Sequence, residues 1–193
     1  MSLFDKFKNK KSKVELEPDM KPCVDEEQER RKTMEQQLAA LYNKLAKHIV
    51  AMIPVKWGEF HYLGEIEKGK QSYSSVFYFR DISRGEFVES NDMPRIHQIP
   101  ESGYLLQWSQ LNNILLEIYD CFADNGQAPW EQMSLSVDQS GKFKVNYLYD
   151  VMNDQDGGQV VRELIWARDT FGYVPKEGTP ARKILDRYLR SDR

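Results

Sequence analysis

Hydrophobic side chains recur every three or four positions in two long segments of the chain, which is the period of one face of an α-helix. In residues 27–52 this stripe consists of Met34, Leu38, Leu41, Leu45, Ile49 and Met52. In residues 103–123 it consists of Tyr104, Trp108, Leu111, Leu115, Ile118 and Phe122. Pro54 and the pair Asn125-Gly126 follow the two stripes and are typical helix stops. We predict an amphipathic helix in each segment, with Trp108 in the core.

A different pattern, rich in aromatic and β-branched residues, lies between and after these helices. Three such runs are separated by the turn sequences Lys68-Gly69 and Arg84-Gly85, and they contain Trp57, Phe60, Tyr62 and Leu63, then Tyr73 and Val76 to Phe79, then Phe87 and Val88. Two further runs alternate strictly on either side of residues 138–141, with Met133, Leu135 and Val137 followed by Phe143, Val145, Tyr147 and Tyr149. The pattern predicts a three-stranded meander and a separate hairpin.

A loop and two shorter helices are predicted in the remaining segments, and with them the fold class can be predicted. Residues 91–100 contain two prolines and are predicted to form a loop, and shorter helices are predicted over residues 159–171 and 180–190. Because the strands come in hairpins and do not alternate with helices, the sheet should be antiparallel. We therefore expect an α+β fold in which helices pack on one face of an antiparallel sheet of about five strands.

Charge is not uniform along the chain. Residues 1–13 hold five lysines and one aspartate, whereas the remaining residues hold 22 basic and 29 acidic side chains, a net charge of −7. Residues 1–26 have few apolar positions and should form a mobile tail, and residues 27–193 should form a single domain. An acidic body does not suit direct binding to nucleic acid but suits a basic protein partner.

The composition also predicts the compartment. No apolar run is long enough to span a membrane, and residues 1–13 lack the apolar core of a secretory signal. Leu3, Phe4 and Phe7 lie among lysines, but this stretch is too short for stable membrane association. We expect a cytoplasmic protein in which Cys23 and Cys121 are free thiols.

The search for catalytic or metal-binding patterns gives no positive signal. His48, His61 and His97 have no metal-ligand spacing, and no glycine-rich phosphate loop is present. The acidic stretch 154–157 resembles part of a calcium loop, but the twelve-residue register lacks its closing glutamate. We expect no cofactor, no metal and no enzyme activity. An enzyme that uses Cys121 or a pair of carboxylates stays open as an alternative if the fold brings a histidine close.

The C-terminal half carries an ordered set of short motifs. They are Asn125-Gly126-Gln-Ala-Pro-Trp130, Met133-Ser-Leu-Ser-Val137, Gly141-Lys-Phe-Lys-Val-Asn-Tyr147, Tyr149-Asp150, Arg162-Glu163-Leu164-Ile165-Trp166 and Gly172-Tyr-Val-Pro175. Together with Ile53-Pro54 and Trp57, this set resembles the YezG-like immunity protein family over roughly residues 34–189. The resemblance implies a cytoplasmic antidote that binds a cognate bacterial toxin stoichiometrically, often a toxin with a nuclease domain.

The chain also offers candidate contact residues for such a partner. Aspartates near helix and strand ends should be exposed, and we take as partner-binding candidates Asp120, Asp124, Asp150, Asp154 and Asp156. Trp130, Phe143, Tyr147 and Trp166 share the periodic faces and are expected in the core. An adaptor or structural protein that docks through its N-terminal tail is the alternative function.

Overall fold

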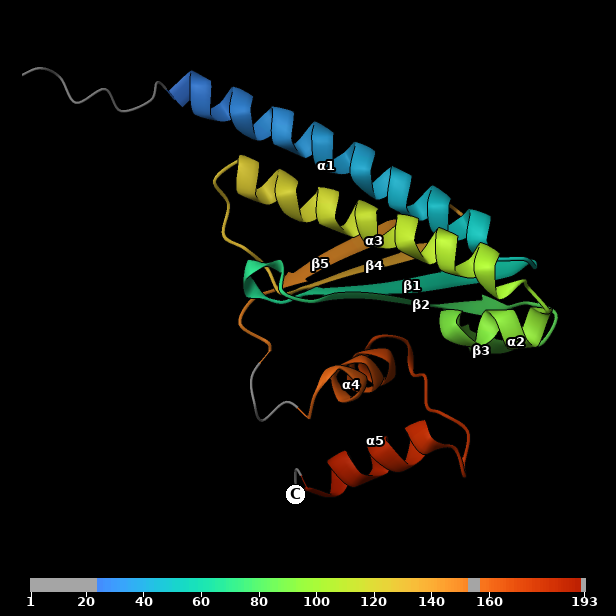
Figure 1. Cartoon of the computed structure of the whole chain (residues 1–193). Helices are drawn as coiled ribbons and strands as arrows, with labels where there is room; N and C mark the ends of the chain where they lie inside the picture. Colours follow the sequence, from blue (N-terminus) through green and yellow to red (C-terminus); the bar gives the residue numbers. More distant parts are fainter. Residues whose placement is uncertain (1–23, 153–156, 192–193) are drawn as a thin grey trace, which may run out of the picture.

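The computed structural model describes residues 24–152 and 157–191 (Figure 1). The elements in chain order are α1 (Val24–Met52), β1 (Trp57–Ile66), the one-turn helix η1 (Lys68–Lys70), β2 (Tyr73–Asp81), β3 (Glu86–Glu89), the one-turn helix η2 (Ser90–Asp92), α2 (Met93–His97), α3 (Glu101–Asp124), β4 (Gln132–Asp138), β5 (Phe143–Leu148), α4 (Gln159–Phe171) and α5 (Pro180–Ser191). The predicted α+β class is confirmed.

The strands form one antiparallel sheet in the order β3-β2-β1-β4-β5. The meander and the hairpin are both present as predicted, and β4 joins them by pairing with the free side of β1. Phe60 of β1 thus lies opposite Phe79 of β2 and opposite Val137 of β4. β1 is the centre of the sheet, and β3 and β5 are its two edges.

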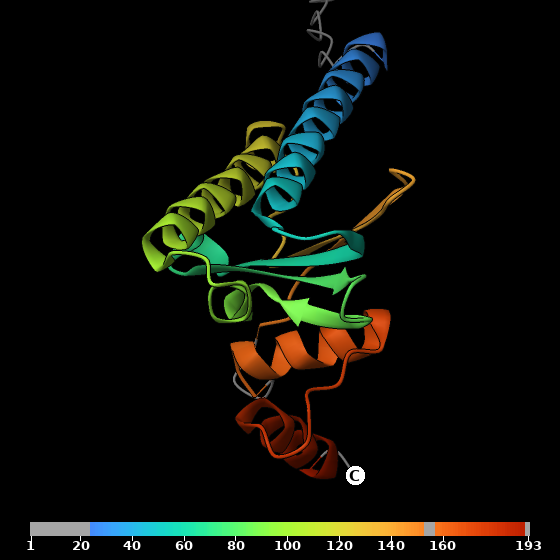
Figure 2. The ribbon, with the colours of Figure 1, turned by 90° about the vertical axis from the view of Figure 1, so that its right-hand side faces the viewer.

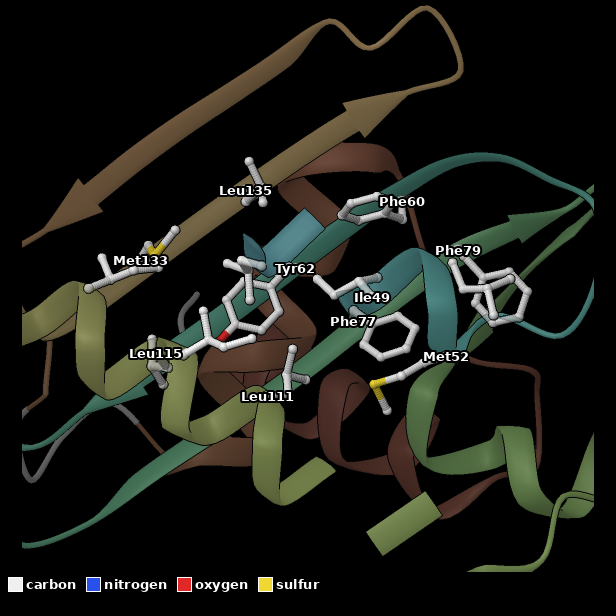
Figure 3. Close-up of a cluster of buried hydrophobic side chains, with 14 of the residues drawn as sticks. Ile49, Met52, Phe60, Tyr62, Phe77, Phe79, Leu111, Leu115, Met133 and Leu135 are labelled. Carbon is white, nitrogen blue, oxygen red and sulfur yellow. The ribbon is translucent and has the colours of Figure 1, made fainter. Parts of the chain in front are cut away.

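The helices α1 and α3 run antiparallel to each other across one face of this sheet (Figures 1 and 2). The core between them contains Leu45, Ile49, Phe60, Tyr62, Phe77, Phe79, Leu111, Leu115 and Trp130, all fully buried, and Figure 3 shows several of these side chains meeting. Gly64 permits this close packing, because a Cβ at this position would lie 2.5 Å from Leu115 Cδ1. The two predicted stripes are therefore the core-facing sides of these helices.

The prediction that all helices pack on one face is wrong, because α4 covers the opposite face of the meander (Figure 2). Here Ala167 packs against Leu63, Val76 and Tyr78, which point away from α1 and α3. These strands carry apolar side chains on both faces, so both faces need cover. α5 lies outside α4, and its Leu185 is buried.

Three further differences from the sequence prediction are local. Residues 91–100 form η2 and α2 and not only a loop, because Pro94 occupies the first turn of α2, where its missing N–H is not needed. α1 begins at Val24, inside the predicted tail, and residues 1–23 lie outside the described part of the chain. Phe143 is 52% exposed and not in the core, because β5 is an edge strand.

In the described part of the chain, none of the helices combines the length and the apolar character that crossing a bilayer requires.

Candidate functional site

Three of the five candidate aspartates lie at the same end of the molecule. Asp120 and Asp124 are in the last turns of α3, and Asp150 lies two residues after the end of β5. Figure 1 shows the end of α3, the end of β5 and η1 at this end of the sheet. Asp154 and Asp156 lie outside the described residues. We call this surface the η1 end.

Two of these aspartates form ion pairs with the turn between β1 and β2. Lys68 contacts Asp150, and Lys70 contacts Asp120. Lys68 also lies 3.6 Å from the buried carboxylate of Glu131. Exposed pairs of this kind contribute about 1 kcal/mol or less to stability, so a charged partner could exchange them for its own contacts at little expense in stability.

Asp124 differs from the other two because it has no ion pair among the described residues. It is exposed and is the last residue of α3, where the helix dipole places partial negative charge. The last turn of α3 also contains no basic side chain. An uncompensated carboxylate in this position is unfavourable for the helix, which singles Asp124 out as a candidate for contact with a cation.

The η1 end also carries large exposed apolar side chains that the sequence analysis did not identify as site residues. Tyr73 is 46% exposed, Leu148 is 47% exposed and Tyr149 is 46% exposed. Tyr149 shares the alternation of Val145 and Tyr147, so the sequence pattern gave no sign that it is exposed. Exposed tyrosines beside carboxylates supply both the aromatic anchors and the charge typical of protein interfaces.

A second group of polar side chains is buried between the sheet and α4. Arg162 of α4 holds Glu65 of β1 through two hydrogen bonds of 2.9 Å, from Nε to Oε1 and from Nη2 to Oε2. Gln132 donates a third hydrogen bond, also of 2.9 Å, to Oε1 of the same carboxylate. The side chain of Glu65 is only 4% exposed, so this ion pair fixes α4 to the sheet.

The next residue of α4 makes a related contact. The Tyr78 hydroxyl donates to Glu163 Oε1 at 2.6 Å. Burial, together with the nearby carboxylates Glu89 and Glu65, raises the pKa of Glu163 to about 7, while the hydrogen bond from Tyr78 opposes this shift. Burial also raises the pKa of Glu89. Glu163 lies on the face of α4 that packs against the sheet, so its hydrogen bond with Tyr78 is a structural contact between them.

Beside this cluster, a groove of about 630 Å³ separates β3 and α2 from the connection between α4 and α5. Its walls contain Phe87, Phe171 and Tyr173 together with charged side chains that pair with one another. Lys176 Nζ lies 3.0 Å from Glu86 Oε2, and Arg84 Nη2 lies 2.7 Å from Glu86 Oε1. The groove is therefore crossed by ion pairs that tie the α4–α5 connection to the edge of the sheet.

The histidines and the cysteine that were considered for catalysis lie in different parts of the fold and make separate contacts. His48 contacts the Gln107 carbonyl, and His61 stacks on Phe171 with ring centroids 4.3 Å apart. Burial lowers the pKa of His61 despite the neighbouring Glu59. Cys121 is a free, buried thiol as expected, and burial followed by the charge of Asp124 raises its pKa. A raised pKa favours the protonated thiol, which is a poor nucleophile.

Within residues 24–152 and 157–191, no three side chains of the His, Cys, Asp or Glu types gather as metal ligands would.

Comparison with known proteins gives a consistent result. The model of the family described as immunity protein YezG-like matches residues 38–185. The immunity protein YezG of Bacillus spizizenii is 27% identical over 154 residues, covering 79% of this chain and 92% of that protein. The type VII secretion system protein EsaG of Staphylococcus aureus is 23% identical over 161 residues, covering 82% of this chain and 97% of that protein. YezG of Bacillus subtilis is 23% identical over 139 residues.

Proposed function

The chain belongs to the YezG-like immunity protein family, and from this premise we propose that it neutralises a cognate bacterial toxin by binding it. The observation that carries the proposal is the family match over residues 38–185, which includes the whole sheet and all four long helices in part or in full. Two relatives are themselves named immunity proteins. In this reading the protein is a binding protein and not an enzyme, and it acts in the cytoplasm of the cell that makes the toxin.

We further propose that the partner is a basic domain, of the nuclease type, held in a stoichiometric complex. Residues 14–193 have a net charge of −7, of which residues 27–193 contribute −3, and an acidic protein associates rapidly with a basic surface because the long-range attraction steers their encounter. A nuclease needs a basic surface to bind its nucleic acid. An acidic partner that covers this surface would block the substrate.

The contact surface that we propose is the η1 end. Its candidates are Asp120, Asp124 and Asp150, with Asp154 and Asp156 as further candidates outside the described residues. Support comes from the charge of Asp124, which has no ion pair among the described residues, and from the exposed side chains of Tyr149 and Leu148 at the same end of the sheet. The lysine pairs of Asp120 and Asp150 would be replaced by contacts to the partner.

The test is to express the full chain together with the toxin domain encoded beside its gene. We expect one complex of equal stoichiometry on size-exclusion chromatography with light scattering, and we expect the chain to rescue growth of cells that make the toxin. Incubation of the toxin with plasmid DNA or with RNA, with and without the chain, then tests the nuclease proposal separately. Failure to bind and to protect would refute the toxin-neutralising role.

The alternative is an adaptor that docks through its N-terminal tail, which the five lysines and the residues Leu3, Phe4 and Phe7 favour. Because α1 begins at Val24, deletion of residues 1–23 removes the tail without shortening a described helix. Our proposal predicts that the truncated chain still binds and protects with affinity within about twofold of the full chain. Loss of function on this deletion would favour the adaptor.

A further inference from the structure

The two edges of the sheet differ in what covers them. β3 has four residues, and the connection between α4 and α5 lies against it, with Tyr173 in the same groove as Phe87 and with Lys176 paired to Glu86. β5 has six residues and pairs only with β4 in the described part of the chain. Figure 2 shows the β4–β5 hairpin extending past the helices at the margin of the molecule. β5 is therefore the open edge.

The backbone of this edge presents unpaired hydrogen-bonding groups. The Asp138 N–H donates to the Lys142 carbonyl at 3.1 Å at the base of the hairpin. In an antiparallel ladder the bonded residues alternate, so Lys144 and Asn146 direct their backbone groups to β4. Phe143, Val145 and Tyr147 then direct theirs outward, and within the described residues no backbone bond outside the ladder involves them. Such a row is a template for another strand.

Exposed apolar side chains concentrate on the same strand. Phe143, Leu148 and Tyr149 are each about half exposed and lie at the two ends of β5. On the side of the sheet that faces α1, the Phe143 ring lies 6.4 Å from the ring of Tyr42, and the hydroxyls of Tyr42 and Tyr147 are 2.7 Å apart. This side of β5 thus offers an aromatic surface that α1 covers incompletely.

We propose that the toxin binds by adding one of its own extended segments to the sheet, antiparallel or parallel to β5. This inference rests on the proposed function and specifies how the partner is held. Backbone hydrogen bonds to Phe143, Val145 and Tyr147 supply the pairing, and Asp150 at the end of the strand continues it into the η1 end. The surface is therefore a strand edge joined to an acidic patch.

The side chains of β5 define the kind of strand that fits. Positions opposite Phe143, Val145 and Tyr147 should be apolar or aromatic, because they share the face covered by α1. The position opposite Lys144 should be polar or acidic, because like charges directly opposite each other are unfavourable. Basic residues of the partner belong beyond the strand, against Asp150 and Asp124.

A second copy of this chain is a less suitable occupant of the edge. Each copy has a net charge of −3, so two copies repel each other weakly, whereas a basic domain is attracted. The experiment below separates these occupants.

The first measurement is amide hydrogen exchange of the full chain, alone and in complex with the toxin domain encoded beside its gene. The proposal predicts slower exchange of Phe143, Val145 and Tyr147 by about a hundredfold or more in the complex, with little change in β3. A complex that forms without protecting β5 would overturn this inference and leave the proposed function standing. Absence of any complex would refute both. Protection of β5 that depends on the concentration of the chain alone would show self-pairing and overturn the inference.

The second measurement compares two variants at one exposed position. Phe143→Ala and Phe143→Pro both lose the ring, but only proline removes the outward N–H, and proline is tolerated on a sheet edge. We expect Phe143→Pro to bind the toxin at least about tenfold more weakly than Phe143→Ala. Equal affinities of the two variants, with both folded by circular dichroism, would contradict strand pairing.

Discussion

At the scale of single residues, the structure separates acidic side chains by their surroundings. Glu163 is buried between α4 and the sheet against the Tyr78 hydroxyl, whereas Asp124 is exposed at the end of α3 without an ion pair among the described residues. The first environment favours the neutral carboxyl group, and the second leaves the charge available to a partner. The same residue class therefore has a structural role in one place and a proposed binding role in the other.

The raised pKa of Glu163 makes stability depend on pH. The folded protein keeps this proton up to about pH 7, whereas the unfolded chain releases it near 4.5. The folded state thus binds more protons between these values, so this contribution to the free energy of unfolding is present below about pH 4.5 and is lost as the pH rises through 7. We expect Glu163→Gln to be more stable than the wild type by about 3 kcal/mol at pH 8 and nearly equal to it at pH 4.

Urea denaturation across this pH range measures the difference between the two proteins. Glu101→Gln, at an exposed carboxylate on the first residue of α3, is the control for removing a carboxylate outside the contact between α4 and the sheet. A constant offset between Glu163→Gln and the wild type at all pH values would contradict the assignment.

Asp124 allows a test of the proposed contact surface. Asp124→Lys and Glu101→Lys make the same change in net charge at opposite ends of α3. If the η1 end binds the toxin, Asp124→Lys should weaken binding about tenfold or more, mainly through slower association, and Glu101→Lys should change it less than about threefold. Surface plasmon resonance gives both rates, and equal effects of the two variants would mean that only net charge matters.

At the scale of elements, the packing of α3 on β1 depends on a missing side chain. At Gly64 a Cβ would meet Leu115 Cδ1 at 2.5 Å and the Tyr62 hydroxyl oxygen at 2.7 Å. Tyr62 Oη is already engaged with Ser75 Oγ at 2.8 Å, so it has little freedom to move. The sequence pattern predicts both elements, but the closeness of their contact follows only from the assembled fold.

Gly64→Ala should therefore lower the free energy of unfolding by about 1–3 kcal/mol through overpacking. Gly103 provides a matched control, because it lies inside α3 and a Cβ there would meet nothing within 4 Å. Gly103→Ala should raise the free energy of unfolding by about 0.5–1 kcal/mol, since alanine is the better helix former. Chemical denaturation of both variants checks the pair, and a destabilised Gly103→Ala would invalidate the comparison.

At the scale of the whole molecule, the sheet is covered on both faces (Figure 2). The helices α1 and α3 lie on one face, and α4 lies on the other with α5 outside it. Residues 27–193 have a net charge of −3, and ion pairs such as Lys44 to Glu117 bridge α1 and α3. Net charge acts at long range and is screened by salt, whereas strand pairing acts on contact. The two parts of the proposed binding mode should therefore respond differently to ionic strength.

We expect the association rate with the toxin to fall by about tenfold between low and physiological ionic strength, while the dissociation rate changes by less than about threefold. Stopped-flow fluorescence at several salt concentrations measures the first rate, and competition with unlabelled chain measures the second. An association rate that is independent of salt would contradict electrostatic steering by the acidic body.

The sequence by itself determined the positions of the long helices and of all five strands, because helical and alternating periodicities are local properties of the chain. It also determined the acidity of the body, and its ordered motifs indicated the family. Only the tertiary structure placed α4 on the second face, brought Tyr78 to Glu163 across 85 positions of sequence and paired Asp120 and Asp150 with lysines. It also left Phe143 and Tyr149 exposed, although they share the alternation of the partly buried residues Val145 and Tyr147. Periodicity says which face a side chain takes, but whether another element covers that face depends on contacts between distant parts of the chain.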